Sequence, residues 1–317
     1  MDSHFLERAM ELAERGRGTT HPNPAVGAVV VVGGQLVGEG WHERKGEAHA
    51  EVLALAAAGG PRGGTVYVTL EPCAHHGDTP PCVDALVDAG VARVVAGQTD
   101  PHPAHGGGLE RLAAAGVEIE LAEGELAFRC RQQIEEWRTW VTLKRPFVTY
   151  KVAVTLDGRV TVPGSRWVTG EESRRLVHVL RAQSDSVAVG MGTVRWDSPR
   201  LDARDVPVLR QPRRIAFGRG PLPEGSELEL RSGPLREELE SLATEGVQSL
   251  LLEGGPTLAA AFLEQDLVDK LLVFVAPRLS GEGSGMLAGL LRPLSLTRLE
   301  ARRIGDDVLL QAYLHEP

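Results

Sequence analysis

The stretch VTLEPCAHHGDTPPC (68–82) decides the fold of the first half of the chain, together with His49-Ala50-Glu51 about twenty residues before it. These segments supply one imidazole, two thiols and a carboxyl group: His49, Cys73, Cys82 and Glu51. Zinc held by three protein ligands keeps an open position, where it binds water and lowers the pKa of that water to about 7. In zinc deaminases the glutamate two residues after the histidine is not a ligand and moves protons instead. The pattern therefore predicts a zinc deaminase with His49, Cys73 and Cys82 as metal ligands and Glu51 as the catalytic residue.

The spacing of the two cysteines departs from the usual P-C-x-x-C signature, because eight residues separate Cys73 from Cys82. Pro80 and Pro81 end any helix before Cys82 and favour a new helix over 82–89. A thiol at a helix N-terminus has a lowered pKa, which favours the thiolate that binds metal. The third cysteine, Cys130, is expected to pack in the core.

Composition excludes several classes of protein. A length of 317 residues indicates two domains, and no apolar run approaches the ~18 residues of a transmembrane helix. The formal net charge of −9 argues against a nucleic-acid partner, because such partners are held through phosphate neutralisation. The first 17 residues are charged and amphipathic, unlike a signal peptide, and three cysteines suit a reducing compartment. We expect a cytoplasmic protein with no membrane partner.

Strand and helix patterns alternate along the first half. Strands are expected at 25–32, 35–41, 65–70, 91–97 and 117–121, and helices at 48–58, 82–89, 108–115 and 125–143. Such alternation indicates a sheet covered by helices on both faces. A domain boundary is expected at Arg145-Pro146, which separates domains 1–144 and 145–317.

A second α/β pattern follows this boundary. Strands are expected at 147–154, 186–190, 214–217, 249–253, 271–276 and 308–313, helices at 171–182 and 258–264, and a surface connection at 218–236. Two glycine-rich segments, Gly190-Met191-Gly192-Thr193-Val194 and Glu253-Gly254-Gly255-Pro256-Thr257, each follow a buried strand. Free N–H groups at such a turn into a helix bind phosphate, so the pair favours a nucleotide cofactor.

The motifs resemble one family over essentially the whole chain. HPNPAVGAVVV (21–31), GEAHAEVLAL (46–55) and VTLEPCAHHGDTPPC (68–82) are similar to the deaminase half of the riboflavin-biosynthesis deaminase/reductases. The reductase half of that family resembles KVAVTLDGRV (151–160), SRWVTG (165–170), LRAQSD (180–185), GMGTV (190–194) and EGGPTLAAAF (253–262). The resemblance implies an α/β protein of two domains, a zinc cytidine-deaminase-like α/β/α sandwich followed by a dihydrofolate-reductase-like α/β domain.

The resemblance also implies two consecutive reactions with Zn²⁺ and NADPH as cofactors. The first is hydrolytic deamination of 2,5-diamino-6-(5-phosphoribosylamino)pyrimidin-4-one, and the second is reduction of the ribosyl group of the product to ribityl. The deaminase substrate positions are Asn23, His42 and His75. The NADPH positions are Val154, Trp167, Thr193, Asp197, Gly255, Pro256, Thr257, Leu258, Ala259, Ala260 and Ala261. The reductase substrate positions are Lys151, Ser165, Arg181, Leu201, Arg204 and Glu253. The family further implies a homodimer that forms through the C-terminal domain.

The chain departs from the family pattern at two places that bear on phosphate binding. Asp78 stands where the family commonly has a basic residue, and Arg44 and Lys45 are candidate replacements. Gly218-Arg219-Gly220 stands where the family often has Asp-Ser, so the contacts to the adenosine end of the cofactor must differ. An arginine beside a nucleotide ribose accommodates the 2′-phosphate of NADP, and Arg219 is a candidate for this role.

Two alternatives remain at this point. The first is a zinc deaminase of the nucleoside or tRNA type whose second half binds RNA, against which the net charge and the 4% aromatic content argue. The second is a working deaminase followed by a non-catalytic dimerisation domain. Both alternatives predict that the protein does not bind NADPH, whereas the bifunctional enzyme must bind it.

Overall fold

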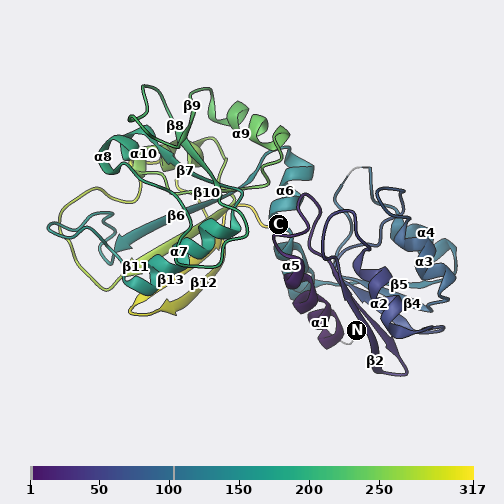
Figure 1. Ribbon diagram of the computed structural model, residues 1–317. Coiled ribbons are helices and arrows are strands. Elements are labelled where there is room, and N and C mark those ends of the chain that lie inside the picture. The colour runs from purple at the N-terminus through teal and green to yellow at the C-terminus, as the bar shows by residue number, and fades with distance from the viewer. Residues whose placement is uncertain (1–2, 103) are drawn as a thin grey trace. The chain divides into compact units, whose positions relative to one another are not determined.

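The computed structural model describes residues 3–102 and 104–317 (Figure 1). Their contacts form two compact units: residues up to Leu143 together with Pro317, and residues 144–316. The sequence alone places the boundary one residue later. None of the helices in the described ranges is both long and apolar enough to span a membrane.

The first unit is built on a five-stranded sheet with the order β2-β1-β3-β4-β5. The strands are β1 (Gly27–Val32), β2 (Gln35–Trp41), β3 (Thr65–Val68), β4 (Arg93–Ala96) and β5 (Glu118–Leu121). β1 is antiparallel to β2 and β3, whereas β3, β4 and β5 run parallel. The turn between β1 and β2 uses Gly33 and Gly34, both with positive φ, as expected for a tight hairpin.

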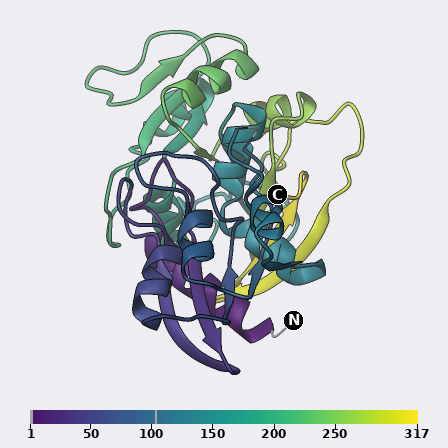
Figure 2. The same ribbon diagram turned by 90° about the vertical axis from the view of Figure 1, so that its right-hand side faces the viewer.

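Helices cover both faces of this sheet (Figures 1 and 2). One face packs against α1 (Ser3–Ala13), which continues into η1 (Glu14–Gly16), and against α5 (Gly124–Gln133). The other face packs against α2 (Ala50–Ala58), α3 (Cys82–Asp88) and α4 (Gly108–Ala114). Successive β1 side chains alternate between the faces, since Ala28 and Val30 belong to one core cluster and Val29 and Val31 to the other. The predicted α/β/α sandwich is confirmed.

The prediction of one continuous helix over 125–143 is wrong, because the structure has two helices there. α5 ends at Gln133 and α6 (Glu135–Leu143) follows, with Ile134 between them at φ −124°. Ile134 is 4% exposed and packs with Leu70, Trp137 and Val141. The Ile134 side chain is thus buried in a small separate cluster at the point where the helix breaks. The spacing of apolar residues in the sequence does not reveal this break.

The second unit contains an eight-stranded sheet with the order β12-β13-β11-β6-β10-β7-β8-β9. The strands are β6 (Phe147–Thr155), β7 (Ser186–Gly190), β8 (Arg213–Phe217), β9 (Glu229–Arg231), β10 (Ser249–Leu252), β11 (Lys270–Ala276), β12 (Thr297–Ile304) and β13 (Asp307–Tyr313). The ladders from β11 to β9 are parallel, and β13 is antiparallel to β11 and β12. α9 (Leu235–Thr244) and α10 (Pro256–Glu264) pack in one core cluster, whereas α7 (Glu171–Gln183) and α8 (Met191–Asp197) pack against other clusters.

Four of these elements were not expected from the sequence: β9, β12, α8 and α9. The segment 218–236, predicted to be a surface connection, in fact contains β9 and the first two residues of α9. β12 escapes recognition because it is an edge strand whose residues are almost all exposed and mostly polar, so it lacks the alternation that marks a half-buried strand.

A buried ion pair fixes the beginning of β6. The Arg145 guanidinium donates to both carboxylate oxygens of Asp269 at 2.6 and 2.7 Å, and the Val148 amide donates to the same carboxylate at 2.7 Å. The side chains of both charged residues are almost fully buried. A buried charge requires this degree of pairing, and the pair ties the first strand of the unit to the segment before β11.

Candidate active sites

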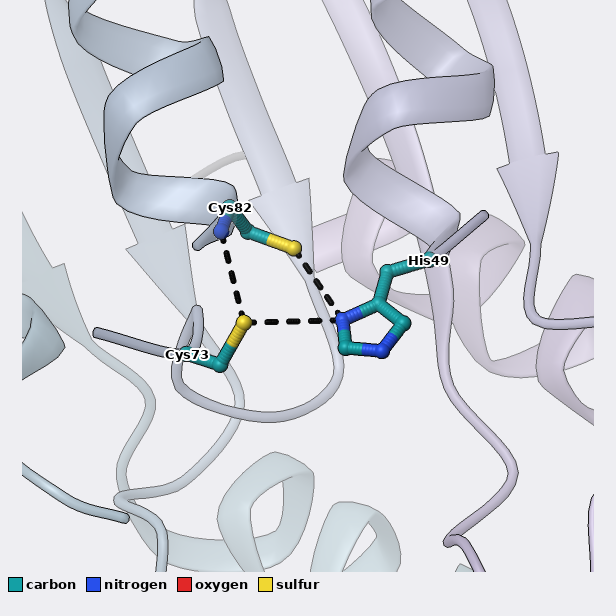
Figure 3. Close-up of side chains that lie close together, drawn as sticks. All are labelled: His49, Cys73 and Cys82. Carbon is teal, nitrogen blue, oxygen red and sulfur yellow. Dashed lines mark hydrogen bonds between the residues drawn. The ribbon is translucent and has the colours of Figure 1, made fainter. Parts of the chain in front are cut away.

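Three predicted metal ligands converge in the first unit (Figure 3). His49 is the N-cap residue of α2, Cys73 follows β3, and Cys82 is the first residue of α3. Their ligand atoms all lie within 4.8 Å of one another. Nδ1 of His49 is 3.2 Å from the Cys82 sulfur and 3.5 Å from the Cys73 sulfur. One imidazole nitrogen and two sulfurs are a donor set that suits zinc, so the residues fit the metal.

The electrostatics of the two thiols also suit a cation. The Cys82 amide donates to the Cys73 sulfur at 3.3 Å. Hydrogen bonding from Cys82 and from His49 lowers the pKa of Cys73, whereas hydrogen bonding to Cys73 and burial raise the pKa of Cys82. A metal ion binds the thiolate form of cysteine, and the lowered pKa of Cys73 favours that form.

Glu51 lies in the first turn of α2 and is 3% exposed. Burial raises the pKa of its carboxyl group to about 7. The residue lines a cavity of about 490 Å³ that His49 and Cys73 also line. A carboxyl group that exchanges its proton near neutral pH is suited to general acid/base chemistry.

The predicted deaminase substrate residues line the same cavity. The Asn23 amide lies 3.3 Å from Nε2 of His42, and Nδ1 of His42 lies 3.3 Å from the Ala48 carbonyl oxygen. Burial lowers the pKa of His42, which favours a neutral ring. The carbonyl requires a proton on Nδ1, so Nε2 is the acceptor of the Asn23 amide. The two side chains are thus fixed in orientation at the cavity wall.

Several residues that line this cavity were not predicted from the sequence: Thr79, Asp100, His102, His105, Trp137 and Trp140. The rings of His75, His105 and His102 stack in a column, with centroids 3.9 and 3.6 Å apart. Asp100 and His102 follow β4, and polar residues just after a buried strand are the signal that could have revealed them. Asp78 lines the cavity, whereas Arg44 and Lys45, the candidate replacements for the missing basic residue, are not among its lining residues.

Glu71 is a further residue of this site whose importance the sequence patterns do not reveal. Its carboxylate accepts hydrogen bonds from the amides of Asp100, Gly107, Gly108 and Leu109 at 2.6 to 3.1 Å. Only 6% of the residue is exposed. Because Glu71 stands two residues before Cys73, it fastens the loop after β4 to the metal-binding segment.

The second unit has a cavity of about 1250 Å³. Lys151 on β6, Arg181 on α7 and Glu253 just after β10 meet in its wall. Lys151 Nζ donates to Glu253 at 3.0 Å, and the Arg181 guanidinium donates to both Glu253 oxygens at 2.6 and 3.0 Å. Burial opposes ionisation of Glu253, yet the two cations lower its pKa to about 2. The three side chains form a charged cluster that is poorly exposed to water.

The two glycine-rich turns lie together at this cavity. A Cβ atom on Gly255 would be 3.4 Å from Oγ1 of Thr193, and a Cβ atom on Gly190 would be 3.5 Å from Leu258. α8 begins directly after β7, and α10 begins four residues after β10. The cavity therefore lies at the carboxyl ends of parallel strands, where open α/β sheets bind ligands.

The structure brings most, but not all, of the predicted reductase residues to the cavity. Those at the cavity are Lys151, Trp167, Arg181, Thr193, Asp197, Arg204, Glu253, Gly255, Pro256, Thr257, Leu258 and Ala261. Those away from it are Val154, Ser165, Leu201, Ala259 and Ala260. The helical turn of α10 explains part of this division, because Leu258 and Ala261 line the cavity while Ala259 and Ala260 are buried. The Ser165 hydroxyl is exposed and donates to the Trp167 carbonyl.

Comparison with known proteins agrees with both sites. The cytidine and deoxycytidylate deaminase zinc-binding region matches residues 1–98, and the RibD C-terminal domain matches residues 146–310. The chain belongs to the RibD family. The riboflavin biosynthesis proteins RibD of Aquifex aeolicus (strain VF5) and Escherichia coli (strain K12) are 37% and 38% identical to it, and each alignment covers 98% of both chains.

Solved structures of RibD proteins are similar over the same extent. A RibD of Acinetobacter baumannii has a TM-score of 0.87 at 34% identity. The diaminohydroxyphosphoribosylaminopyrimidine deaminase/5-amino-6-(5-phosphoribosylamino)uracil reductase of Thermotoga maritima has a TM-score of 0.86 at 33% identity. Both comparisons cover 98% of each chain. The resemblance read from the motifs is confirmed, and the chain is a two-domain deaminase/reductase with zinc and NADPH as its cofactors.

The hydrogen bonds of Glu71 lead to a testable prediction. Glu71→Ala removes the acceptor of four backbone amides, and buried donors without a partner cost roughly 1–3 kcal/mol each when they stay dry. We expect the amides of Asp100, Gly107, Gly108 and Leu109 to exchange with solvent much faster than in the unaltered protein. Hydrogen–deuterium exchange measures this, with Glu110→Ala, at an exposed position of α4, as the control. Unchanged protection of these four amides would contradict the role of Glu71.

Proposed function

We propose that the first unit deaminates 2,5-diamino-6-(5-phosphoribosylamino)pyrimidin-4-one and that the second reduces the ribosyl group of the product to ribityl. The observation that carries the proposal is the convergence of His49, Cys73 and Cys82 beside a buried Glu51 in one cavity. The charged cluster of Lys151, Arg181 and Glu253 in the other cavity supports the second reaction. The substrate follows from the family resemblance.

In the proposed deamination, water replaces the amino group and ammonia leaves. Zinc, when bound by His49, Cys73 and Cys82, supplies a Lewis acid that makes water a nucleophile near neutral pH. The Glu51 carboxylate takes the proton that water loses and returns it to the departing amino group. Burial raises the pKa of Glu51, so its carboxyl group takes up a proton more readily than that of an exposed glutamate.

Asn23 and His42 are proposed to hold the pyrimidine. The amide of Asn23 offers a further donor and an acceptor, and both residues line the cavity that contains Glu51. The Thr79 hydroxyl lies 3.4 Å from Nε2 of His49, on the side of the ring away from the sulfurs. A partner at the outer nitrogen of a ligating imidazole fixes the orientation of the ring.

In the proposed reduction, a C–H bond forms at C1 of the ribose while the bond from C1 to the ring oxygen breaks. NADPH, when bound, supplies the hydride, and the glycine turns with Thr193 are its proposed contacts. The released ring oxygen needs a proton, and Lys151 is a partly buried cation in the cavity wall that can donate one. Glu253 holds Lys151 and Arg181 in place through the bonds given above. Arg204, which also lines the cavity, is proposed to bind the substrate phosphate.

We further propose that the protein is a homodimer that pairs through its second unit, and that it works in the cytoplasm. The exposed edge strand β12, on which Leu299 is 68% exposed, offers a surface for pairing. All three cysteines are free, which suits a reducing compartment. Light scattering should give twice the chain mass of 34.0 kDa, and a value near one chain mass would contradict the dimer.

The proposed pair of reactions is tested by a mass-spectrometric time course. The zinc-loaded protein is mixed with the diaminopyrimidine ribosylamino phosphate, with and without NADPH. We expect the deaminated product without NADPH, and a deaminated product heavier by two hydrogen atoms with it. Deamination that NADPH leaves unchanged would show that the second unit does not reduce this compound, and no product in either reaction would contradict the proposed substrate.

A substitution separates the role of Glu51 from those of the metal ligands. Glu51→Ala should retain zinc, because three ligands remain, but should lose deamination by at least about 10²-fold, because the general acid/base is gone. Metal content by atomic emission and the rate of ammonia release measure the two effects. His49→Ala is the matched variant, and it should lose zinc as well. Loss of zinc from Glu51→Ala would mean that Glu51 is a ligand.

A further inference from the structure

The segment 198–205, which we call the Arg204 loop, connects the end of α8 to Arg204, the residue proposed to bind the substrate phosphate. Three of its residues, Ser198, Leu201 and Asp205, have positive φ angles of 43°, 54° and 59°. This left-handed conformation is unfavourable for residues other than glycine, so contacts around the loop must hold it. Leu201 makes one such contact, because its side chain is almost fully buried in a core cluster with residues of β7 and β8.

Two side chains of α7 hold the backbone of the loop at Asp202. Nη1 of Arg181 donates to the Asp202 carbonyl oxygen at 3.1 Å, and Nδ1 of His178 lies 3.2 Å from the same oxygen. The buried carboxylate of Asp202 in turn accepts a hydrogen bond from Nη1 of Arg204 at 2.7 Å. The direction of the Arg204 guanidinium therefore depends on the position of the loop backbone.

Gln211 holds the residue that lies between Asp202 and Arg204. The Ala203 amide donates to Oε1 of Gln211 at 2.9 Å, and Nε2 of Gln211 donates to the Ala203 carbonyl oxygen at 2.7 Å. One side-chain amide thus pairs both backbone groups of Ala203, as a neighbouring strand would. Ala203 is almost fully buried, so water does not readily replace either bond. Gln211 stands two residues before β8, and these bonds fasten the loop to the start of that strand.

We propose that Gln211 is a positioning residue of the reductase, which holds Arg204 in place for the substrate phosphate without touching the substrate. Arg204 is among the residues that line the cavity, and Gln211 is not. A loop in an unfavourable conformation moves when the bonds that hold it are removed, and a guanidinium that has moved binds a phosphate less well. The inference rests on the proposed reductase function and on the role of Arg204 in it.

Steady-state kinetics of the reductase reaction, with the deaminated pyrimidine ribosyl phosphate as substrate, test the inference. Gln211→Met keeps the length of the side chain but removes its donor and its acceptor. We expect the KM for this substrate to rise by about tenfold, because two hydrogen bonds are lost, while kcat and the affinity for NADPH stay nearly unchanged. Gln265→Met is the matched control, because Gln265 is an exposed glutamine directly after α10, and its KM should equal that of the unaltered protein.

A double-mutant cycle with Arg204→Ala distinguishes positioning from a general structural role. Arg204→Ala should raise the KM by itself, and Gln211→Met should add little in that background, because Gln211 acts through Arg204. Effects of the two substitutions that multiply in the double variant would overturn the inference, as would an equal fall in kcat. Gln211→Glu, which loses only the donor, is the second variant if Gln211→Met does not fold, and it should also raise the KM.

The same measurements separate this inference from the function on which it rests. If Arg204→Ala raises the KM and Gln211→Met does not, the reductase function stands and only this inference fails. If Arg204→Ala leaves the KM unchanged, the role of Arg204 fails and the inference fails with it. If the unaltered protein does not reduce the substrate, the proposed function itself is wrong.

Discussion

A carboxyl group that is buried away from water must pair with a cation, accept hydrogen bonds or take up a proton. This requirement determines how the glutamates of both cavities are arranged. Glu71 meets it with four backbone amides, which fasten one loop of the deaminase cavity. Glu253 meets it with Lys151 and Arg181, which positions two cations in the reductase cavity. Glu51 has too few partners of either kind, so burial raises the pKa of its carboxyl group to about 7 and the group can exchange a proton. The same residue type thus serves as a structural anchor, an ion-pair partner and a proton carrier.

Both cavities lie where strands end. Lys151 lies on β6 itself, but many of the groups at the two cavities stand on segments that follow strands. Cys73 follows β3, Asp100 follows β4 and Glu253 follows β10, and the helices that come next contribute Cys82 and the α10 turn. The two units share this arrangement although their sheets differ in strand order and in the number of strands.

Much of the fold was predictable because its strands are apolar and its turns contain glycine or proline. The five strands of the first sheet and the buried strands β6, β7, β8 and β10 were all expected near their observed bounds. Two of the features that were missed or misjudged have weak local signals. β12 is polar and exposed, and Ile134, at the break between α5 and α6, packs against Leu70, which is distant in the sequence.

The sequence alone determined the chemistry of the first site, because His49, Glu51, Cys73 and Cys82 are recognisable by residue type and spacing. It also identified the two glycine turns of the second unit. Only the tertiary structure decided which residues surround these groups. Glu71 meets the amides of residues about thirty positions away, and the imidazoles of His75 and His105 stack across two loops. Likewise, α10 turns Ala259 and Ala260 into the core and leaves Leu258 at the cavity. The physical reason is that burial and neighbouring charge are set by contacts between distant segments, and no local pattern of residues encodes them.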